Sequence, residues 1–367
     1  MSSSILKGQS RNGSEAGLVI QPDSPWLAPL AGYSNLPFRI LCRELGAGVA
    51  CTEMVSAKGI YYSLEQFAPP LLEEISGKGG KGSRGTWALL ASQDDDGPLV
   101  VQLFGAEAEI VKAAATAVLE LFKGREIYFD LNMGCSVPKV VKTGAGAVML
   151  EDVPNALKVA RALIEVAGPG RAGFKLRLGW LKGDDVYLDV ARRLEDLGAG
   201  WITLHPRYGK QAFTGQADWA KLGRLKDSVG IPVVASGDLL TAQAAKNCLE
   251  QTGADAVMFA RGAMNNPFIF REFCQLMHEG QISQPTAGEL LAVISRHREL
   301  SLKWQDERYA LSQMRGFIPR YVHNFPGVRA LRQSLSACQN WDDMDIVISE
   351  FVLALSKPGA LNGCEKG

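Results

Sequence analysis

Hydrophobic and polar positions follow two different patterns along the chain, and the change comes near residue 280. Before it, short runs that are apolar at nearly every position alternate with longer segments in which apolar residues recur every three or four positions. The apolar runs cover residues 25–31, 47–54, 98–104, 127–132, 172–178, 200–205, 231–236 and 254–260. Strands that are apolar throughout are typical of a parallel sheet that is buried on both faces.

The number and order of these runs predict a (β/α)8 TIM barrel over residues 21–280, with a doubly wound parallel sheet as the alternative fold. The intervening segments suit crossover helices. Residues 185–198, for example, carry Val186, Val190 and Leu194 on one helical face and end at Gly198, a usual helix stop. Residues 1–20 precede the predicted barrel domain and are expected to form a flexible N-terminus.

Two segments depart from this alternation. Residues 76–97 are rich in glycine, serine and charge, which predicts a surface insertion in the barrel. From residue 281 to 356 the strand pattern stops and helical periodicity continues, so we expect a smaller, all-helical C-terminal domain. Residues 357–367 are expected to form a loose tail.

The overall charge is balanced, with 39 basic and 39 acidic residues, so no global field favours nucleic acid or a membrane surface. The cysteines are odd in number, widely spaced and without a CxxC pair, which argues against a disulfide framework and a zinc site. No run approaches the ~20 apolar residues of a membrane span, and the N-terminus lacks a signal-peptide core. We therefore expect a cytoplasmic monomer with reduced thiols, no metal and no membrane partner.

Polar and small residues gather at the predicted carboxyl ends of the strands, where the active site of a TIM barrel lies. They are Pro29, Leu30 and Ala31; Gln102; Asn132 and Cys135; Lys175 and Arg177; His205 and Arg207; Ser236, Gly237 and Asp238; and Ala260, Arg261 and Gly262. The last two groups follow the seventh and eighth strands, where barrels commonly bind phosphate through backbone amides and a cation.

Cys135 is the most informative of these residues. A lone cysteine is more often a small core residue than a reactive one. Here, however, Asn132, Gly134 and Pro138 surround it in a stretch that reads as a loop after a strand, so a substrate could reach its thiol. Lys175 is costly to bury alone, which makes it a site candidate, although a buried ion pair is an equally good interpretation. His205 is interpreted as a ligand contact rather than a structural histidine.

Taken together, several motifs resemble the tRNA-dihydrouridine synthase family, in its bacterial form, from about residue 25 to about residue 335. APLAGYSNLPFR, ELGAG and TEMVSAKG resemble the opening of the family, and LNMGCSVPKVVKTGAGAVML resembles its catalytic cysteine motif. KLRLGW, LHPRYGKQAFTGQADW, IPVVASGDL and ARGAMNNPFIF resemble the later blocks, in the same order. The chain differs from the usual motifs at Ser136, where proline is common, at Ser236, where asparagine is common, and at Ala260, where glycine is common.

The resemblance implies an FMN-dependent, NADPH-consuming enzyme that reduces the carbon 5 to carbon 6 double bond of uridines in tRNA. It implies that Cys135 donates the proton to carbon 5, opposite the hydride that FMN gives to carbon 6. The residues that it assigns to FMN are Pro29, Leu30, Ala31, Gln102, Lys175, His205, Ser236, Gly237, Asp238, Ala260 and Arg261. Asn132 and Arg207 are expected to contact the substrate.

A local basic stretch offers a place for the RNA despite the balanced net charge. Residues 308–341 contain no aspartate or glutamate, and aromatic residues lie among their arginines. Such clusters neutralise phosphates and stack bases, so we expect tRNA contact there rather than an ordinary solvated helix face. The arginines assigned to it are Arg315, Arg320, Arg329 and Arg332.

Three other functions are compatible with parts of the sequence. A flavin-dependent reductase of a free pyrimidine would use the same barrel and need no RNA. A Schiff-base aldolase would use Lys175 as its nucleophile. A tRNA-binding protein without catalysis is suggested only by the departure at Ser136. None of these accounts for both the cysteine motif and the basic stretch.

Overall fold

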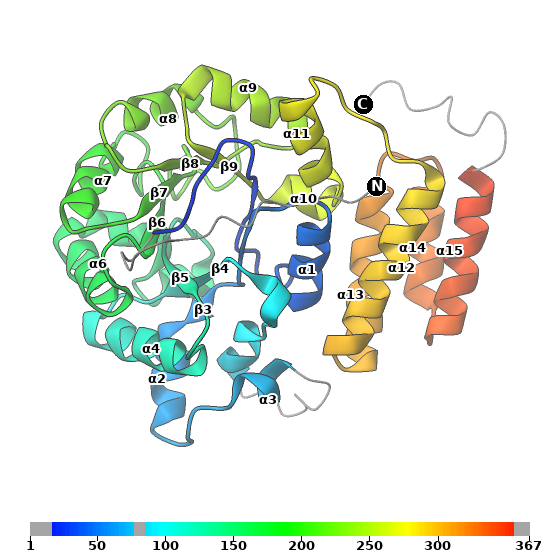
Figure 1. Ribbon diagram of the computed structural model, residues 1–367, viewed down its shortest axis with the longest axis horizontal. Coiled ribbons are helices and arrows are strands. Elements are labelled where there is room, and N and C mark those ends of the chain that lie inside the picture. The colour runs from blue at the N-terminus through cyan, green and yellow to red at the C-terminus, as the bar shows by residue number, and fades with distance from the viewer. Residues whose placement is uncertain (1–16, 77–84, 356–367) are drawn as a thin grey trace, which may run out of the picture.

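In the computed structural model, which describes residues 17–76 and 85–355, a parallel barrel lies beside a bundle of four helices (Figure 1). The strands are β1 (Trp26–Leu27), β2 (Val49–Cys51), β3 (Val55–Ser56), β4 (Leu99–Phe104), β5 (Ile127–Met133), β6 (Ala172–Leu176), β7 (Trp201–Leu204), β8 (Val233–Ala235) and β9 (Ala256–Phe259). They pair in the order β2-β1-β9-β8-β7-β6-β5-β4, and a β2–β4 pairing closes the ring. The short strand β3 pairs with β4 beyond the end of β2. This closure confirms the predicted TIM barrel and excludes the open doubly wound sheet.

Helices cover the outside of the barrel and connect its strands (Figure 1). They are α1 (Leu36–Glu44), α2 (Ala57–Leu64), α3 (Leu72–Ser76), α4 (Ala108–Leu121), α5 (Pro138–Val141), α6 (Val153–Ala167), α7 (Tyr187–Asp196), α8 (Trp219–Lys226), α9 (Ala242–Thr252), α10 (Arg261–Asn265) and α11 (Ile269–His278). Three short 3₁₀ segments, η1 (Gly85–Leu90), η2 (Asp94–Asp96) and η3 (Gly146–Glu151), complete the connections.

The barrel interior is packed with side chains at its amino-terminal end. Trp26, Tyr128 and Trp201 meet there, with the rings of Trp26 and Trp201 5.5 Å apart in an edge-on contact. Gly173 on the neighbouring strand makes room, because a Cβ atom there would lie 1.9 Å from the Trp201 ring. Residues that face outward from the same strands pack under the helices. Both faces are therefore buried, which explains why the strands are apolar at nearly every position.

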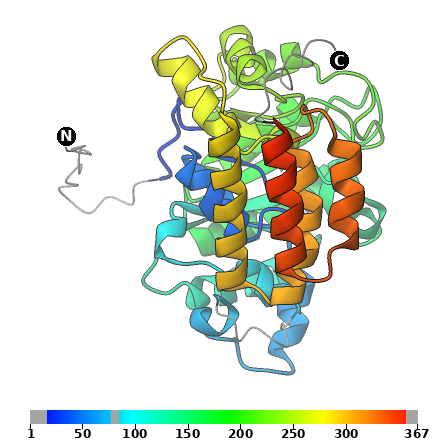
Figure 2. The same cartoon turned by 90° about the vertical axis from the view of Figure 1, so that its right-hand side faces the viewer.

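The C-terminal helices α12 (Ala287–Trp304), α13 (Glu307–Tyr321), α14 (Val328–Ala337) and α15 (Trp341–Leu355) run alongside one another (Figure 2). Helix α12 begins with a capping box, in which the Thr286 hydroxyl and the Glu289 carboxylate bond each other's backbone N–H groups. The bundle packs on α1 through a ring cluster in which Phe317 lies 5.1 Å from Phe38 and 4.5 Å from His297. Within the described ranges, no helix is long and apolar enough to cross a bilayer.

The structure corrects the predicted surface insertion over residues 76–97. Residues 77–84 lie outside the described residues, but the remainder packs on the barrel, with Trp87, Leu90 and Asp96 buried. Asp96 accepts hydrogen bonds from Arg39 Nε at 3.1 and 3.2 Å and from its Nη2 at 2.6 Å. One residue of an acidic triplet that would suit a solvated loop, Asp96, therefore neutralises a fully buried arginine on α1. The predicted flexible terminus and tail fall largely on residues 1–16 and 356–367, also outside the described residues.

Replacing Asp96 by alanine should destabilise the protein by about 3–5 kcal/mol, because it leaves the Arg39 guanidinium buried without its counter-charge. The midpoint of urea unfolding, followed by circular dichroism, measures the loss. Asp95→Ala is the matched control, because the neighbouring Asp95 side chain is exposed. Equal midpoints for the two variants would show that the buried pair contributes no stability.

A buried histidine should make the stability of the protein depend on pH. Burial of His297 lowers its pKa to about 3, from an ordinary value of 6.5. Between these values only the unfolded chain binds the proton, so the free energy of unfolding should fall as the pH drops from about 6.5 toward about 3. The slope is at most roughly 1.4 kcal/mol per pH unit. Urea midpoints across this range should flatten in His297→Phe, whereas replacing the exposed His323 by glutamine should leave the slope in place.

Candidate active site

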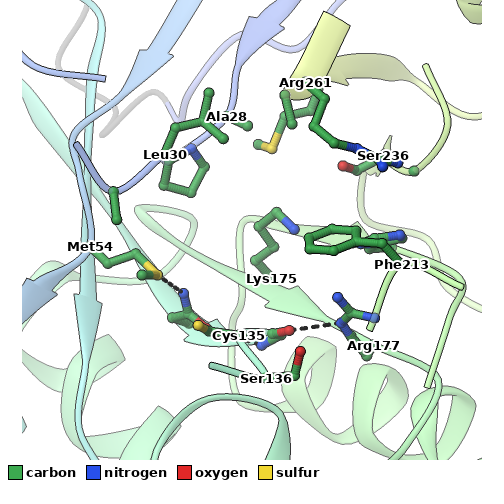
Figure 3. A pocket seen from close by; sticks show the side chains of 18 of the residues that line it. Ala28, Leu30, Met54, Cys135, Ser136, Lys175, Arg177, Phe213, Ser236 and Arg261 are labelled. Carbon is green, nitrogen blue, oxygen red and sulfur yellow. Dashed lines mark hydrogen bonds between the residues drawn. The ribbon is translucent and has the colours of Figure 1, made fainter. Parts of the chain in front are cut away.

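A cavity of about 250 Å³ lies at the carboxyl ends of the barrel strands (Figure 3). Its lining includes most of the residues predicted from the strand ends, namely Pro29, Leu30, Ala31, Asn132, Cys135, Lys175, His205, Ser236, Gly237, Asp238, Ala260 and Arg261. Arg177, predicted at a strand end, and Ser136 of the cysteine motif also line it, together with Met54 and Phe213, which the sequence had not singled out. The barrel thus brings together side chains that are more than 200 residues apart in the sequence.

The loop after β5 presents Cys135 to this cavity with its backbone held in place. Asn132 Oδ1 accepts hydrogen bonds from the N–H groups of Gly134 at 3.1 Å and Cys135 at 2.8 Å. The Cys135 carbonyl accepts from the N–H of Ala147 at 2.8 Å. Gly146 permits that approach, because a Cβ atom at this position would lie 2.4 Å from the Cys135 carbonyl oxygen. The thiol is half-buried and reachable from the cavity.

Gln102 lies beneath the cavity, and its contact with FMN stays a prediction. Its side chain is fully buried and is not part of the lining. In the register of β4 and β5 it stands opposite Asp130, and its Nε2 donates to Asp130 Oδ2 at 2.6 Å. Its Oε1 accepts from Asn132 Nδ2 at 2.8 Å. Gln102 therefore links a buried carboxylate to the residue that holds the Cys135 loop, through one donor and one acceptor position of its amide.

Asp130 is a buried acid that the sequence reasoning did not select. It is 1% exposed, and burial raises its pKa. Its Oδ1 has no hydrogen-bond partner among the described residues, and the positive charge of Lys175 acts on it from the next strand. The signal in the sequence was the spacing of Asp130 and Asn132, which places both on the same face of one strand.

Lys175 reaches into the cavity from β6, where it pairs in register with Asn132 of β5 (Figure 3). Burial lowers its pKa, and so does the nearby charge of Arg177, while Asp130 acts in the opposite direction. No hydrogen bond or ion pair joins its ammonium group to a residue in the described part of the chain. This geometry favours a cation available to a ligand over the alternative of a buried ion pair.

Arg177 braces the two loops on either side of Lys175. Its Nε donates to the carbonyl of Gly134 at 2.8 Å, and its Nη1 donates to the carbonyls of Tyr208 at 3.0 Å and Ala212 at 2.7 Å. The guanidinium also lies 5.7 Å from the ring centroid of Phe213. The sequence placed Arg177 at a strand end, but gave no sign that its hydrogen bonds would join these loops.

Arg207, predicted to contact the substrate, is instead buried behind the cavity and is not part of the lining. It donates to both carboxylate oxygens of Asp238, at 2.9 and 2.7 Å, and to the carbonyls of Thr214 and Gly215. The loop after β7 turns back on itself, so the second residue after His205 faces inward. Arg207 therefore fixes the loop and Asp238, and its contact with a substrate stays a prediction.

The loops after β8 and β9 close the other end of the cavity. Asp238 adopts a left-handed backbone conformation (φ 58°) and accepts hydrogen bonds from Arg207, from Arg261 at 3.0 Å and from the N–H of Ala217 at 2.8 Å. Burial alone would raise the pKa of Asp238, but these hydrogen bonds lower it. Among the described residues, the N–H groups of Gly237 and Arg261 have no acceptor, so they are available to an anion.

His205 lines the cavity as a neutral ring. Burial lowers its pKa well below the usual range, and the charges of Lys175 and Arg177 act in the same direction. Its Nε2 lies 3.1 Å from Arg207 Nη1, which can only donate. Gly237 approaches the same ring so closely that a Cβ atom there would lie 2.6 Å from His205 Cδ2.

The predicted arginines of the bundle take different positions. Arg329 and Arg332 are exposed on α14. Arg315 donates to the carbonyl of Cys338 inside the bundle, and Arg320 lies over the ring of Tyr33 on the barrel side. Only the first two are therefore free to meet an external phosphate without leaving another contact. In the part of the chain that the structure describes, no group of three or more potential metal ligands is present.

Comparisons with known proteins agree with the motifs. The family model described as dihydrouridine synthase matches residues 26–355. A protein of Synechocystis named "Probable tRNA-dihydrouridine synthase 1" is 32% identical, and the match covers 89% of this chain and 87% of that protein. A "Probable tRNA-dihydrouridine synthase" of Treponema pallidum is 33% identical, with 84% and 86% covered. A match to the structure of an old yellow enzyme homologue from Zymomonas mobilis covers 78% of this chain and 94% of that chain, at 15% identity. Its TM-score of 0.48 is too low to support an argument.

Proposed function

Because this chain belongs to the dihydrouridine synthase family, as its motifs predicted, we propose that it reduces the carbon 5 to carbon 6 double bond of uridines in tRNA. FMN would be the bound cofactor and NADPH the reductant. The observation that carries the proposal is the arrangement of Cys135 and Lys175, which face one cavity from adjacent strands. Such a reaction would take place in the cytoplasm, where we expect the protein to act as a monomer.

The cavity suits a flavin nucleotide in three respects. Ala28, Pro29 and Leu30 form an apolar wall that can lie along a planar ring. Lys175 offers a cation without a hydrogen-bond or ion-pair partner among the described residues, and this cation can bond the polar edge of that ring. In the loops after β8 and β9, the N–H groups of Gly237 and Arg261 have no acceptor in the described part of the chain, and together with the Arg261 guanidinium they suit a phosphate.

Bound reduced flavin would supply the hydride to carbon 6 of the uracil ring. Cys135 would donate a proton to carbon 5 from the opposite side, since a thiol is a much stronger acid than an alcohol and still carries its proton at neutral pH. Asn132 would keep the thiol in position through the backbone of Gly134 and Cys135. Lys175 would stabilise negative charge at the carbonyl edge of the bound rings.

The RNA must deliver its target base into this cavity, which requires the uridine to leave its stack. The exposed arginines Arg329 and Arg332 would bind phosphates on the bundle and make the affinity depend on salt. Phe213 is 58% exposed at the rim, held over Arg177 and Arg261, and offers an apolar face close to the entrance.

Nucleoside mass spectrometry on tRNA lacking dihydrouridine tests the proposal. The RNA is incubated with the purified protein, FMN and NADPH, beside a Cys135→Ala control. A gain of two hydrogens on uridine that is lost or greatly slowed in the control is the expected result, and mapping of digests gives the position. No gain from a yellow protein that still oxidises NADPH would contradict the tRNA assignment, and turnover of a free pyrimidine would replace it with a small-molecule reductase.

A further inference from the structure

Helix α13 of the bundle contacts two segments that border the cavity, although none of its own residues lines it. One segment is the loop between β1 and α1, which carries the apolar wall of Ala28, Pro29 and Leu30. The other is α10, whose first residue, Arg261, also lines the cavity and follows β9, the strand that pairs with β1. The bundle therefore supports the walls of the cavity in addition to any contact that it makes with RNA.

The loop after β1 forms a tight turn that is held from both sides. The Leu30 carbonyl accepts hydrogen bonds from the N–H groups of Tyr33 and Ser34, both at 2.9 Å. Gly32 adopts φ 77°, and its N–H donates to the carboxylate of Glu53 at 2.5 Å, at the end of β2. The Gly32 carbonyl faces the bundle and accepts from Gln313 Nε2 at 3.3 Å. The turn is thus fixed by the barrel through its N–H and by the bundle through its carbonyl.

Gln313 uses its full hydrogen-bonding capacity at this contact. Its Nε2 also donates to the Tyr309 hydroxyl at 2.9 Å, while its Oε1 accepts from Asn35 Nδ2 at 2.7 Å and from Gln305 Nε2 at 3.1 Å. Two donors and two acceptor positions are all that an amide offers. Asn35 in turn caps α1 by accepting from the N–H of Phe38. No other orientation of the Gln313 amide would satisfy the same partners.

Aromatic and cationic contacts extend the same interface. Phe317 packs edge-on against Tyr33, with ring centroids 5.3 Å apart, and the Arg320 guanidinium lies 5.2 Å from the Tyr33 centroid. Arg320 also reaches Asn265, the last residue of α10, at 3.4 Å. One face of α13 therefore contacts both the loop after β1 and the short helix after β9, two neighbouring parts of the cavity wall.

We propose that Gln313 is a positioning residue through which the helical bundle holds the β1–α1 loop in the shape that binds the flavin. This inference rests on the proposed function, since it assigns the ligand of the cavity. Because coupling between two equilibria is reciprocal, bound flavin should also stabilise the docking of the bundle on the barrel. Gln313 touches neither the cavity nor an exposed phosphate-binding face, so its effect on the flavin must pass through the loop.

The test compares the flavin affinity of the wild-type protein with that of Gln313→Ala. Both affinities are measured by fluorescence titration of the apoprotein. We expect the dissociation constant to rise about tenfold in Gln313→Ala. Gln333→Ala, at an exposed position of α14, is the matched control and should leave the constant unchanged. Gln313→Glu keeps the acceptor for Asn35 and Gln305 but places a carboxylate against the Gly32 carbonyl, so it should weaken flavin binding at least as much as alanine does.

A second measurement separates a positioning role from a purely structural one. Saturating FMN should raise the unfolding midpoint of the bundle in the wild-type protein and raise it less in Gln313→Ala. If the Gln313 variants unfold at a lower urea concentration but bind flavin with unchanged affinity when folded, the inference is wrong. If the wild-type protein binds no flavin at all, the proposed function itself fails, and that outcome is distinct from equal flavin affinity in wild type and Gln313→Ala.

Discussion

Replacing Cys135 by alanine should slow the formation of dihydrouridine by about 10²–10⁴-fold, because the reaction loses its proton donor. The thiol faces the cavity, and the backbone on both sides of it is fixed by Asn132 and Ala147, so the loop should keep its shape without the sulfur atom. Flavin binding and the oxidation of NADPH should continue, since the apolar wall and the phosphate-binding loops lie on other strands.

Single-turnover experiments with prereduced protein and tRNA isolate this step from the reduction of the flavin. Cys135→Ser should also be slow, because a hydroxyl is a weaker acid than a thiol in the same place. Cys274→Ala is the control, since this half-buried cysteine lies near Asp23 and Gly46, away from the cavity. A Cys135→Ala protein that reduces uridine at the wild-type rate would remove the cysteine from the mechanism.

Replacing Lys175 by methionine should lower the rate by about 10²–10³-fold, the usual effect of removing one preorganised group that stabilises developing charge. Methionine keeps much of the length and apolar contact of the side chain but carries no charge. The loss should appear in the reduction of the flavin by NADPH as well as in the reduction of uridine, which distinguishes Lys175→Met from Cys135→Ala. Stopped-flow absorbance of the flavin measures the first step.

The pH dependence of the wild-type rate offers a further readout of Lys175. Its pKa is lowered by burial, so the ammonium should lose its proton, and the rate should fall, at a pH below the ordinary lysine value of about 10.4. The rate of Lys175→Met should not show this fall at high pH. Lys139→Met, which changes an exposed lysine beside the same loop, should retain it. A wild-type rate that is flat to high pH would contradict a role for the charged ammonium.

The barrel and the central pair of site residues could be predicted from the sequence because both depend on local order. Eight apolar runs predict the eight strands of the closed ring, and the position of Cys135 and Lys175 at strand ends places them at the same rim. The observed strands are shorter than the runs: β1, for example, covers Trp26–Leu27 within the predicted 25–31. Backbone pairing ends before the apolar character does, since the following residues line the cavity.

The contacts that the sequence did not reveal depend on partners that are distant in the sequence. Gln102 sits opposite Asp130, and only the register of β4 and β5 shows that its amide bonds this carboxylate. Arg207 follows His205 closely, but the fold of its loop turns it toward Asp238. Asp96 lies in a polar stretch, yet its partner Arg39 is 57 residues earlier in the chain. A single sequence carries no sign of these pairings.

The packed floor of Trp26, Tyr128 and Trp201 has a consequence for the order of events in the proposed reaction. Because these rings fill the amino-terminal end of the barrel, a flavin bound in the cavity would be open to solvent only at the opposite rim. The nicotinamide and the uridine would then have to reach the flavin through the same opening of the cavity, one after the other. The reaction should therefore follow ping-pong kinetics, in which double-reciprocal plots of the initial rate at different concentrations of the second substrate give parallel lines.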